Sequence, residues 1–106
     1  MEKLLIVDDN EEIKKQLKWG LGKEYSVLLA GDGKEAISLF KEHNPKVIIL
    51  DLGLPPHESE TVEGFRCLEE ILKSLPITKV IVITGNNEKE NALRAIQMGA
   101  YDFYQK

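Results

Sequence analysis

Residues 47–56 read Val-Ile-Ile-Leu-Asp-Leu-Gly-Leu-Pro-Pro, and this stretch decides the fold class. Its four leading apolar residues, three of them β-branched, predict a short strand buried on both faces. The strand ends at the carboxylate of Asp51, and a glycine and two prolines follow closely. Placing a charge at the end of a buried strand is costly unless something compensates it. Asp51 is therefore the first candidate functional residue.

Working outward, similar apolar runs recur along the chain. The five predicted strands are residues 4–7, 25–29, 47–50, 80–83 and 101–104. The segments between them carry apolar residues at helical spacing, which predicts four helices. The expected buried stripes are Ile13, Leu17 and Leu21; Ala36, Ile37 and Phe40; Phe65, Leu68, Ile71, Leu72 and Leu75; and Ala92, Leu93 and Ile96. This alternation predicts an α/β fold with a doubly wound, five-stranded parallel sheet.

Signals for helix ends support this division. Asp32 with Glu35, and Asn87 with Glu90, have the spacing of a capping box. Asn44 before Pro45 predicts the end of the second helix, and Gly99 that of the fourth. Residues 52–62 form the one irregular stretch, and it is long for a loop between a strand and a helix.

Composition sets the broad class. A chain of 106 residues fits one domain, and 18 acidic against 14 basic residues give a net charge of −4. No basic stripe is visible, so we expect no direct nucleic-acid contact by this domain. The single cysteine, Cys67, excludes an intrachain disulfide. No apolar run approaches the ~20 residues of a membrane span, and a cytoplasmic location is the simplest expectation.

Polar residues gather at the predicted carboxyl ends of the strands, where open parallel sheets bind ligands. These residues are Asp8 and Asp9, Asp51, Thr84 and Lys106. Each has a structural alternative: Asp9 as a helix cap, Asp51 as a turn residue, Thr84 as a strand former and Lys106 as a solvated charge. Together, however, three crowded carboxylates would repel one another unless a cation lies between them. Oxygen ligands with room for water suit Mg²⁺ or Mn²⁺.

The same group of residues suggests a reaction. A carboxylate oxygen can attack phosphorus and give an aspartyl phosphate. A metal ion and an ammonium group would neutralise the phosphoryl oxygens, and a hydroxyl could donate to one of them.

At this point the motifs LLIVDDNEE (4–12), VIILDLGLPP (47–56), VIVITG (80–85) and GAYDFYQK (99–106) resemble the receiver domain of bacterial two-component response regulators. The resemblance spans the whole chain, and it implies the CheY-like sheet order 2-1-3-4-5. The motif at 99–106 looks most like receivers of the NtrC group of transcriptional regulators. Since the family continues into a fifth helix, residues 1–106 would form a single receiver domain at the N-terminal end of a longer regulator.

The resemblance implies a role for each residue at the strand ends. Asp51 would accept a phosphoryl group from a sensor histidine kinase. Asp8, Asp9, Asp51 and the backbone carbonyl of Gly53 would bind Mg²⁺. Thr84 and Lys106 would contact the phosphoryl group, and Phe103 takes the place of the family's switch aromatic. Output domains of the longer chain would then be the regulated partners.

The chain departs from the family in one stretch. Between Asp51 and Gly64 it has about five more residues than is usual, which predicts a longer acidic loop beside the site. His57 lies in this loop, where a lone histidine is more often solvated than a ligand. Without the fifth helix, one face of the predicted sheet would be uncovered, and we expect self-association through that face or through the fourth helix and fifth strand.

Three other functions stay open. An aspartate-based phosphatase is one, although such enzymes usually carry a second Asp where this chain has Gly53. A pseudo-receiver that only docks proteins is the second, although the Asp, Thr and Lys set argues against it. A flavodoxin-like cofactor binder is the third, although no glycine loop that could hold a phosphate follows the first strand. The expected protein is a stoichiometric phosphoacceptor with slow self-dephosphorylation rather than an enzyme.

Overall fold

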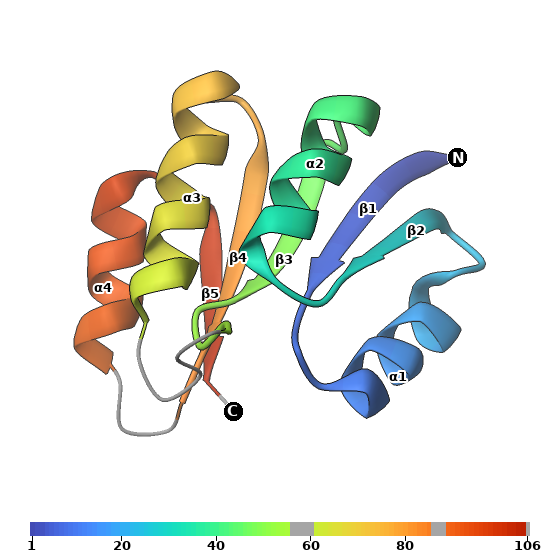
Figure 1. Ribbon diagram of the computed structural model, residues 1–106, viewed down its shortest axis with the longest axis horizontal. Coiled ribbons are helices and arrows are strands. Elements are labelled where there is room, and N and C mark those ends of the chain that lie inside the picture. Colours follow the sequence, from blue (N-terminus) through green and yellow to red (C-terminus); the bar gives the residue numbers. More distant parts are fainter. Residues whose placement is uncertain (56–60, 86–88, 106) are drawn as a thin grey trace.

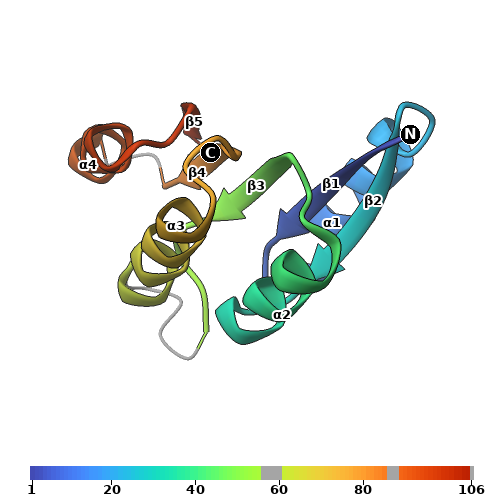
Figure 2. The same ribbon diagram turned by 90° about the horizontal axis from the view of Figure 1, so that it is seen from above.

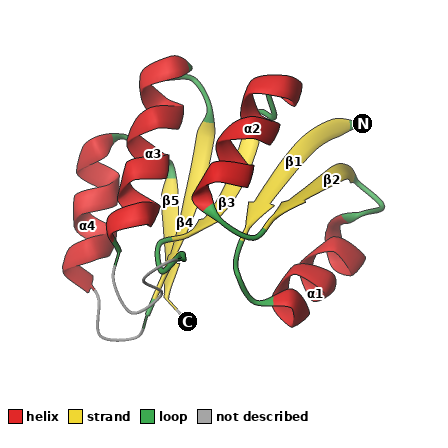
Figure 3. Ribbon diagram, viewed as in Figure 1, coloured by secondary structure: helices red, strands yellow, loops and turns green. Residues whose placement is uncertain are grey.

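The apolar runs of the sequence form the strands of a single parallel sheet in the computed structural model, which describes residues 1–55, 61–85 and 89–105. The chain alternates strictly between strand and helix (Figures 1 and 3). The strands are β1 (Glu2–Val7), β2 (Tyr25–Ala30), β3 (Val47–Asp51), β4 (Lys79–Thr84) and β5 (Asp102–Gln105). The helices are α1 (Glu11–Leu21), α2 (Gly33–His43), α3 (Val62–Ser74) and α4 (Lys89–Met98).

The sheet has the order β2-β1-β3-β4-β5, with every neighbouring pair parallel. This confirms the predicted fold class and strand order. The central strands β1 and β3 pair through Leu5 with Ile48 and Val7 with Leu50, all fully buried. The other face of β1 is buried as well, at Leu4 and Ile6, whereas Val47 and Ile49 of β3 are half-buried. Burial on both faces explains why β1 is a continuous apolar run rather than an alternating one.

The helices cover the two faces of the sheet unequally. Figure 2 shows α1 on one side and α2 and α3 on the other. Side chains from the α2–α3–α4 side form the main core with Leu5, Ile48, Leu50, Val80 and Val82 of the sheet. On the opposite side, α1 packs mainly against β1 and β2, among the described helices and strands. Because side chains alternate along a strand, Ile49, Ile81 and Ile83 face that second side, where they are half-buried.

Side-chain caps fix the helix starts. Asn10, not Asp9, caps α1: its side-chain oxygen accepts hydrogen bonds from the N–H groups of Glu12 (2.9 Å) and Ile13 (3.1 Å). The alternative that Asp9 serves as the cap is thus wrong, because Asn and Asp cap equally well and the helix starts one residue later. Asp32 caps α2 as predicted, with Glu35 N–H donating to it at 2.8 Å. The carboxylate of Glu35 accepts from Gly31 N–H rather than from the cap itself.

Helix ends follow the predicted signals where the structure describes them. Asn44 ends α2 in the left-handed conformation with φ 47°, and Gly99 follows α4 with φ 115°. Both residue types tolerate this conformation, which would strain most others. The predicted cap Asn87 lies outside the described residues.

The buried face of α4 differs from the predicted stripe. Ala92 is buried as predicted, and Ala95 is buried as well, whereas Leu93 and Ile96 are 50% and 38% exposed. Small side chains allow α4 to approach β4, β5 and α3 closely. The predicted stripe followed the largest apolar residues, and here those residues face outward. Among the described helices, none is long and apolar enough to cross a membrane.

Candidate functional site

Two buried carboxylates lie at the carboxyl ends of the central strands. Asp51 is the last residue of β3 and is 3% exposed, and Asp8 directly follows β1 and is 1% exposed. Each carboxylate accepts a hydrogen bond from the N–H two residues on: Asn10 N–H donates to Asp8 at 2.9 Å, and Gly53 N–H donates to Asp51 at 3.0 Å. These short turns orient both carboxylates from rigid strands.

Asp9 completes a cluster with these two residues. One carboxylate oxygen from each of Asp8, Asp9 and Asp51 lies within 4.8 Å of the other two. Asp9 is exposed, so the cluster opens to solvent on one side. Three hard oxygen donors with access for water fit the coordination that Mg²⁺ or Mn²⁺ prefers. The structure thus brings together the three acidic residues that the sequence predicted to be neighbours.

Thr84 ends β4 next to this cluster. Asp51 pairs with Ile83 in the sheet, and Leu52 N–H donates to the carbonyl of Ile83 at 3.1 Å, so Thr84 lies one residue beyond the partner of Asp51. Its side chain is 1% exposed. Among the described residues its Oγ1 has no hydrogen-bond partner. A buried hydroxyl without a partner is costly, and a role for this atom in binding a group at the site stays a prediction.

Of the other residues predicted for the site, the structure describes Phe103 and Gly53. Phe103 lies in β5, half-buried against the main core, and pairs with Val82. Since Thr84 lies two residues after Val82, Phe103 and Thr84 share one face of the sheet. The N–H of Gly53 donates to Asp51, which places Gly53 beside the cluster. That its carbonyl oxygen binds a metal ion stays a prediction. Lys106 and His57 lie outside the described residues.

Comparison with known proteins decides the family. A family model described as "Response regulator receiver domain" matches residues 4–106, almost the entire chain. The chain belongs to the response regulator receiver family. Both the family and the fold that the sequence motifs implied are thereby confirmed.

Individual relatives of this receiver have the NtrC-type character expected from residues 99–106. A "Putative response regulator NtrX-like" protein of Rickettsia felis is 36% identical over 104 residues, which are 97% of this chain but 21% of that protein. The receiver domain of NtrX from Brucella abortus matches with a TM-score of 0.87 and 31% identity, over 97% of this chain and 84% of that structure. A receiver domain protein from Clostridium thermocellum gives a TM-score of 0.89 and 30% identity, over 100% and 82% of the two chains. The receiver thus spans about a fifth of the length of its curated relative.

Gly64 is a positioning residue of this receiver that the sequence indicated only by its place after the long loop. A Cβ on Gly64 would lie 2.2 Å from the carbonyl oxygen and 2.4 Å from the Cα of Leu52. The first turn of α3 therefore packs directly on the backbone that follows Asp51. Gly64 is the point at which the chain returns to the site after the long loop.

Lys14 is a second feature of the receiver that the sequence analysis missed. It is 5% exposed, and its Nζ lies 2.8 Å from Oε1 of Glu11 in the first turn of α1. The hydrogen bond and the positive charge of Lys14 lower the pKa of the Glu11 carboxyl. A lysine on a helix is usually solvated, so nothing in the sequence indicated that Lys14 is buried.

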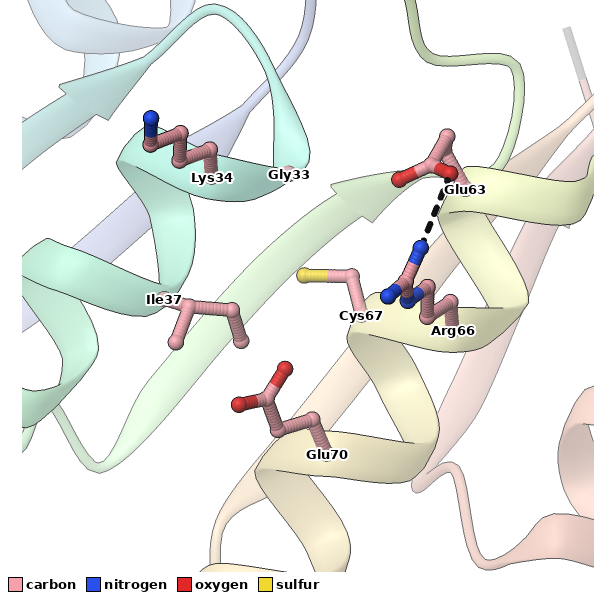
Figure 4. Close-up of a pocket in the computed structure, with 7 residues that line it drawn as sticks. All are labelled: Gly33, Lys34, Ile37, Glu63, Arg66, Cys67 and Glu70. Atoms are coloured by element: carbon pink, nitrogen blue, oxygen red, sulfur yellow. Dashed lines mark ion pairs between the residues drawn. The ribbon is translucent and has the colours of Figure 1, made fainter.

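The only cysteine is not a reactive group. Cys67 is 3% exposed and lines a hollow of about 340 Å³ between α2 and α3, with Ile37, Glu63 and Glu70 nearby (Figure 4). Burial, and then the charges of Glu70 and Glu63, raise its pKa to about 12. Since the thiolate is the nucleophile, a thiol with so high a pKa serves to fill space between α2 and α3.

Proposed function

We propose that this receiver is a phosphorylation-dependent switch of a two-component system, in which Asp51 accepts a phosphoryl group from a sensor histidine kinase in the presence of Mg²⁺ or Mn²⁺. The observation that carries the proposal is the cluster of Asp8, Asp9 and Asp51 at the strand ends. A carboxylate beside two others ionises and reacts best when a cation balances the charge. Membership of the receiver family supports the same assignment.

In the proposed reaction a carboxylate oxygen of Asp51 attacks the phosphorus of a phosphohistidine. The P–O bond forms as the P–N bond breaks, and the bond's electron pair remains on the imidazole nitrogen, which takes up a proton. The Gly53 N–H donates a hydrogen bond to the Asp51 carboxylate and so holds the nucleophile in place. A divalent cation held by the three carboxylates and the Gly53 carbonyl would neutralise charge on the phosphoryl oxygens. Thr84 would donate its hydroxyl to one of these oxygens, and Lys106 would pair with another.

The receiver is proposed to work once per phosphorylation rather than as a turnover enzyme. Gly53 stands where an aspartate-based phosphatase usually has its second Asp, so the site lacks a dedicated acid to speed hydrolysis. Slow self-dephosphorylation by water would reset the switch.

Phosphorylation would reach a partner surface through Thr84 and Phe103. A hydroxyl drawn towards the phosphoryl group leaves space beneath α4, and the half-buried Phe103 ring on the same face can rotate to fill it. This would shift the population of conformations of α4 and β5. Arg94 and Tyr104 are candidate contacts there, and Tyr104 is 66% exposed.

The partners follow from this mechanism. They are a sensor histidine kinase and the output domains of a longer regulator, of which residues 1–106 would be the N-terminal receiver. The name of another relative, "Probable transcriptional regulator ycf27" of Porphyridium aerugineum, supports an output in transcription control. A cytoplasmic location is part of the same proposal. Direct nucleic-acid contact by this domain is not part of the proposal, given its net charge of −4.

The decisive test is mass spectrometry after incubation with acetyl phosphate and Mg²⁺. One labile phosphoryl adduct on Asp51 is expected, and none without the metal. Asp51→Asn should fold normally and carry no adduct, because the amide keeps the shape and loses the nucleophile. The matched control Asp32→Asn changes an exposed helix cap and should be phosphorylated like the unmodified chain. Full labelling of Asp51→Asn at another residue would refute the assignment.

A further inference from the structure

The neighbouring helices α3 and α4 are joined by a contact that the proposed switch does not use (Figure 1). The guanidinium carbon of Arg94, on α4, lies over the Phe65 ring of α3, 4.2 Å from the centre of the ring. Both residues line a hollow of about 250 Å³ between the two helices, together with Val62, Glu69 and Met98. A guanidinium at this distance is attracted to the face of an aromatic ring, so Arg94 links α4 to α3.

The Phe65 ring has a fixed position relative to the acidic cluster. Phe65 is 5% exposed and belongs to the main core. The preceding residue, Gly64, packs directly on the backbone of Leu52, and Leu52 follows Asp51. The ring that Arg94 contacts is therefore held against the end of β3.

The two arginines of the groove differ in what they bind. Arg66 also lines the hollow, but its Nη1 lies 3.6 Å from Oε1 of Glu63, so its charge is paired within α3. Arg94 is exposed, and among the described residues it forms no ion pair. Its guanidinium instead crosses from one helix to the ring of another. Arg94 is thus placed to hold α4 in position, and Arg66 is not.

The remaining packing of α4 is shallow. Ala92 and Ala95 are its buried residues, whereas Leu93 and Ile96 face outward. An alanine side chain makes far fewer van der Waals contacts than a leucine, so this packing resists a shift of α4 only weakly. A directional contact between Arg94 and a fixed ring therefore matters for where α4 lies.

We propose that the Arg94–Phe65 contact is a latch that stabilises the resting position of α4 and so opposes its phosphorylation-dependent shift. The inference rests on the proposed function, since it concerns the regulation of the same site. A shift that moves Arg94 off the ring loses the contact, so the latch lowers the population of the shifted state before phosphorylation. It acts against the link through Thr84 and Phe103, which would favour the shift.

Arg94→Met tests the latch, because methionine keeps an unbranched apolar side chain and removes the charge. Hydrogen exchange is measured first, on the chain with neither metal nor phosphoryl group. Amides of α4 should exchange about threefold faster in the variant, as expected for the loss of one exposed cation–π contact. Beryllofluoride, a mimic of the phosphoryl group, is then titrated in the presence of Mg²⁺. The variant should bind it about threefold more tightly, since the apparent affinity rises with the population of the shifted state.

Arg66→Met is the matched control, since it removes the same charge from the same groove and keeps the ring contact. It should alter neither the exchange of α4 nor the affinity for beryllofluoride. A general loss of positive charge would weaken the binding of this anion rather than strengthen it. In a Phe65→Leu background, Arg94→Met should have no further effect, which would identify the ring as the partner of Arg94.

Several outcomes would overturn the latch. They are equal results for Arg94→Met and the unmodified chain, equal results for the two arginine variants, and weaker beryllofluoride binding by Arg94→Met. Faster exchange of α4 without tighter binding would refute the regulatory role, because the contact would then stabilise α4 alone. If the unmodified chain binds no beryllofluoride, the phosphoacceptor proposal fails, and the exchange measurement decides by itself whether Arg94 holds α4.

Discussion

At the scale of single residues, the three clustered carboxylates differ in their access to solvent. Asp8 and Asp51 are buried at strand ends, whereas Asp9 is exposed. The N–H groups of Asn10 and Gly53 hold the buried pair, and Asn10 rather than Asp9 caps α1. Asp9 is therefore the member that can be removed with least effect on packing, and it is the best place to test metal binding.

Asp9→Ala should weaken Mg²⁺ binding by about tenfold or more, because one of three charged ligands is lost. Without metal the same variant should be slightly more stable, since it relieves repulsion among like charges. Calorimetric titration with Mg²⁺ and urea unfolding measure the two effects. Glu12→Ala, which removes a nearby charge outside the cluster, is the control and should retain Mg²⁺ affinity. An unchanged titration for Asp9→Ala would exclude it as a ligand.

Cys67 gives a prediction for alkaline pH. Its pKa is raised from 9.0 to about 12 in the folded chain, chiefly by burial. Between these values the folded state keeps a proton that the unfolded state loses, so the free energy of unfolding falls as pH rises. Cys67→Ala removes this contribution. The stability advantage of the unmodified chain over the variant should therefore narrow from about pH 8 to about pH 10.5 in urea unfolding. A constant difference across this range would contradict the raised pKa.

At the scale of elements, the contact between α3 and the end of β3 governs how the site is closed. The long loop leaves the sheet after Asp51, and Gly64 brings the chain back onto the Leu52 backbone. A turn of helix packed on backbone leaves no space for a side chain, so the position of α3 depends on the absence of a Cβ.

Gly64→Ala should destabilise the fold by about 3 kcal/mol, since the added methyl group forces α3 away from Leu52. Gly20→Ala is the matched control: Gly20 is also helical, and a Cβ there would meet nothing within 4 Å. The control should gain about 0.5–1 kcal/mol, because alanine favours a helix more than glycine does. Urea unfolding of both variants gives the comparison. Similar effects of the two changes would show that the close approach at Leu52 does not constrain α3.

The elements themselves could be predicted well from the sequence, and their faces less well. Continuous apolar runs and turn residues located every strand to within a few residues, and the strand ends brought Asp8, Asp9 and Asp51 together as expected. The burial of Lys14 and the outward direction of Leu93 and Ile96 were not predictable. They depend on which neighbours each helix meets, and local periodicity contains no information about those neighbours.

At the scale of the whole molecule, the two faces of the sheet are covered unequally. The helices α2, α3 and α4 bury one face, whereas the described residues place only α1 on the other. Half-buried side chains of β3 and β4, including Ile49, Ile81 and Ile83, and the exposed Tyr104 of β5 lie towards the side without a covering helix. Apolar surface of this kind favours association with another surface.

A longer chain that continues through a fifth helix should therefore be more stable and less prone to associate than residues 1–106. The expected result is a higher melting temperature for the longer chain and concentration-dependent light scattering for the shorter one. Ile81→Lys in the shorter chain should reduce association, because it places a charge on the uncovered face. Lys46→Ala, a change at an exposed residue, serves as the control. If the shorter chain is monomeric at high concentration and melts at the same temperature as the longer one, the uncovered face has no such role.

The strand order has a consequence for synthesis on the ribosome. Of the five strands of this sheet, β1 is made before the others and becomes an inner strand, and its neighbour β3 is made only after α1, β2 and α2. A nascent chain of which only β1 and β2 have emerged from the ribosome contains Asp8 and Asp9 but lacks Asp51. Until β4 follows, Thr84 and the outer neighbour of β3 are missing as well. The acidic cluster thus forms late in translation, and the phosphorylation proposed for this site would have to wait until most of the sheet has emerged.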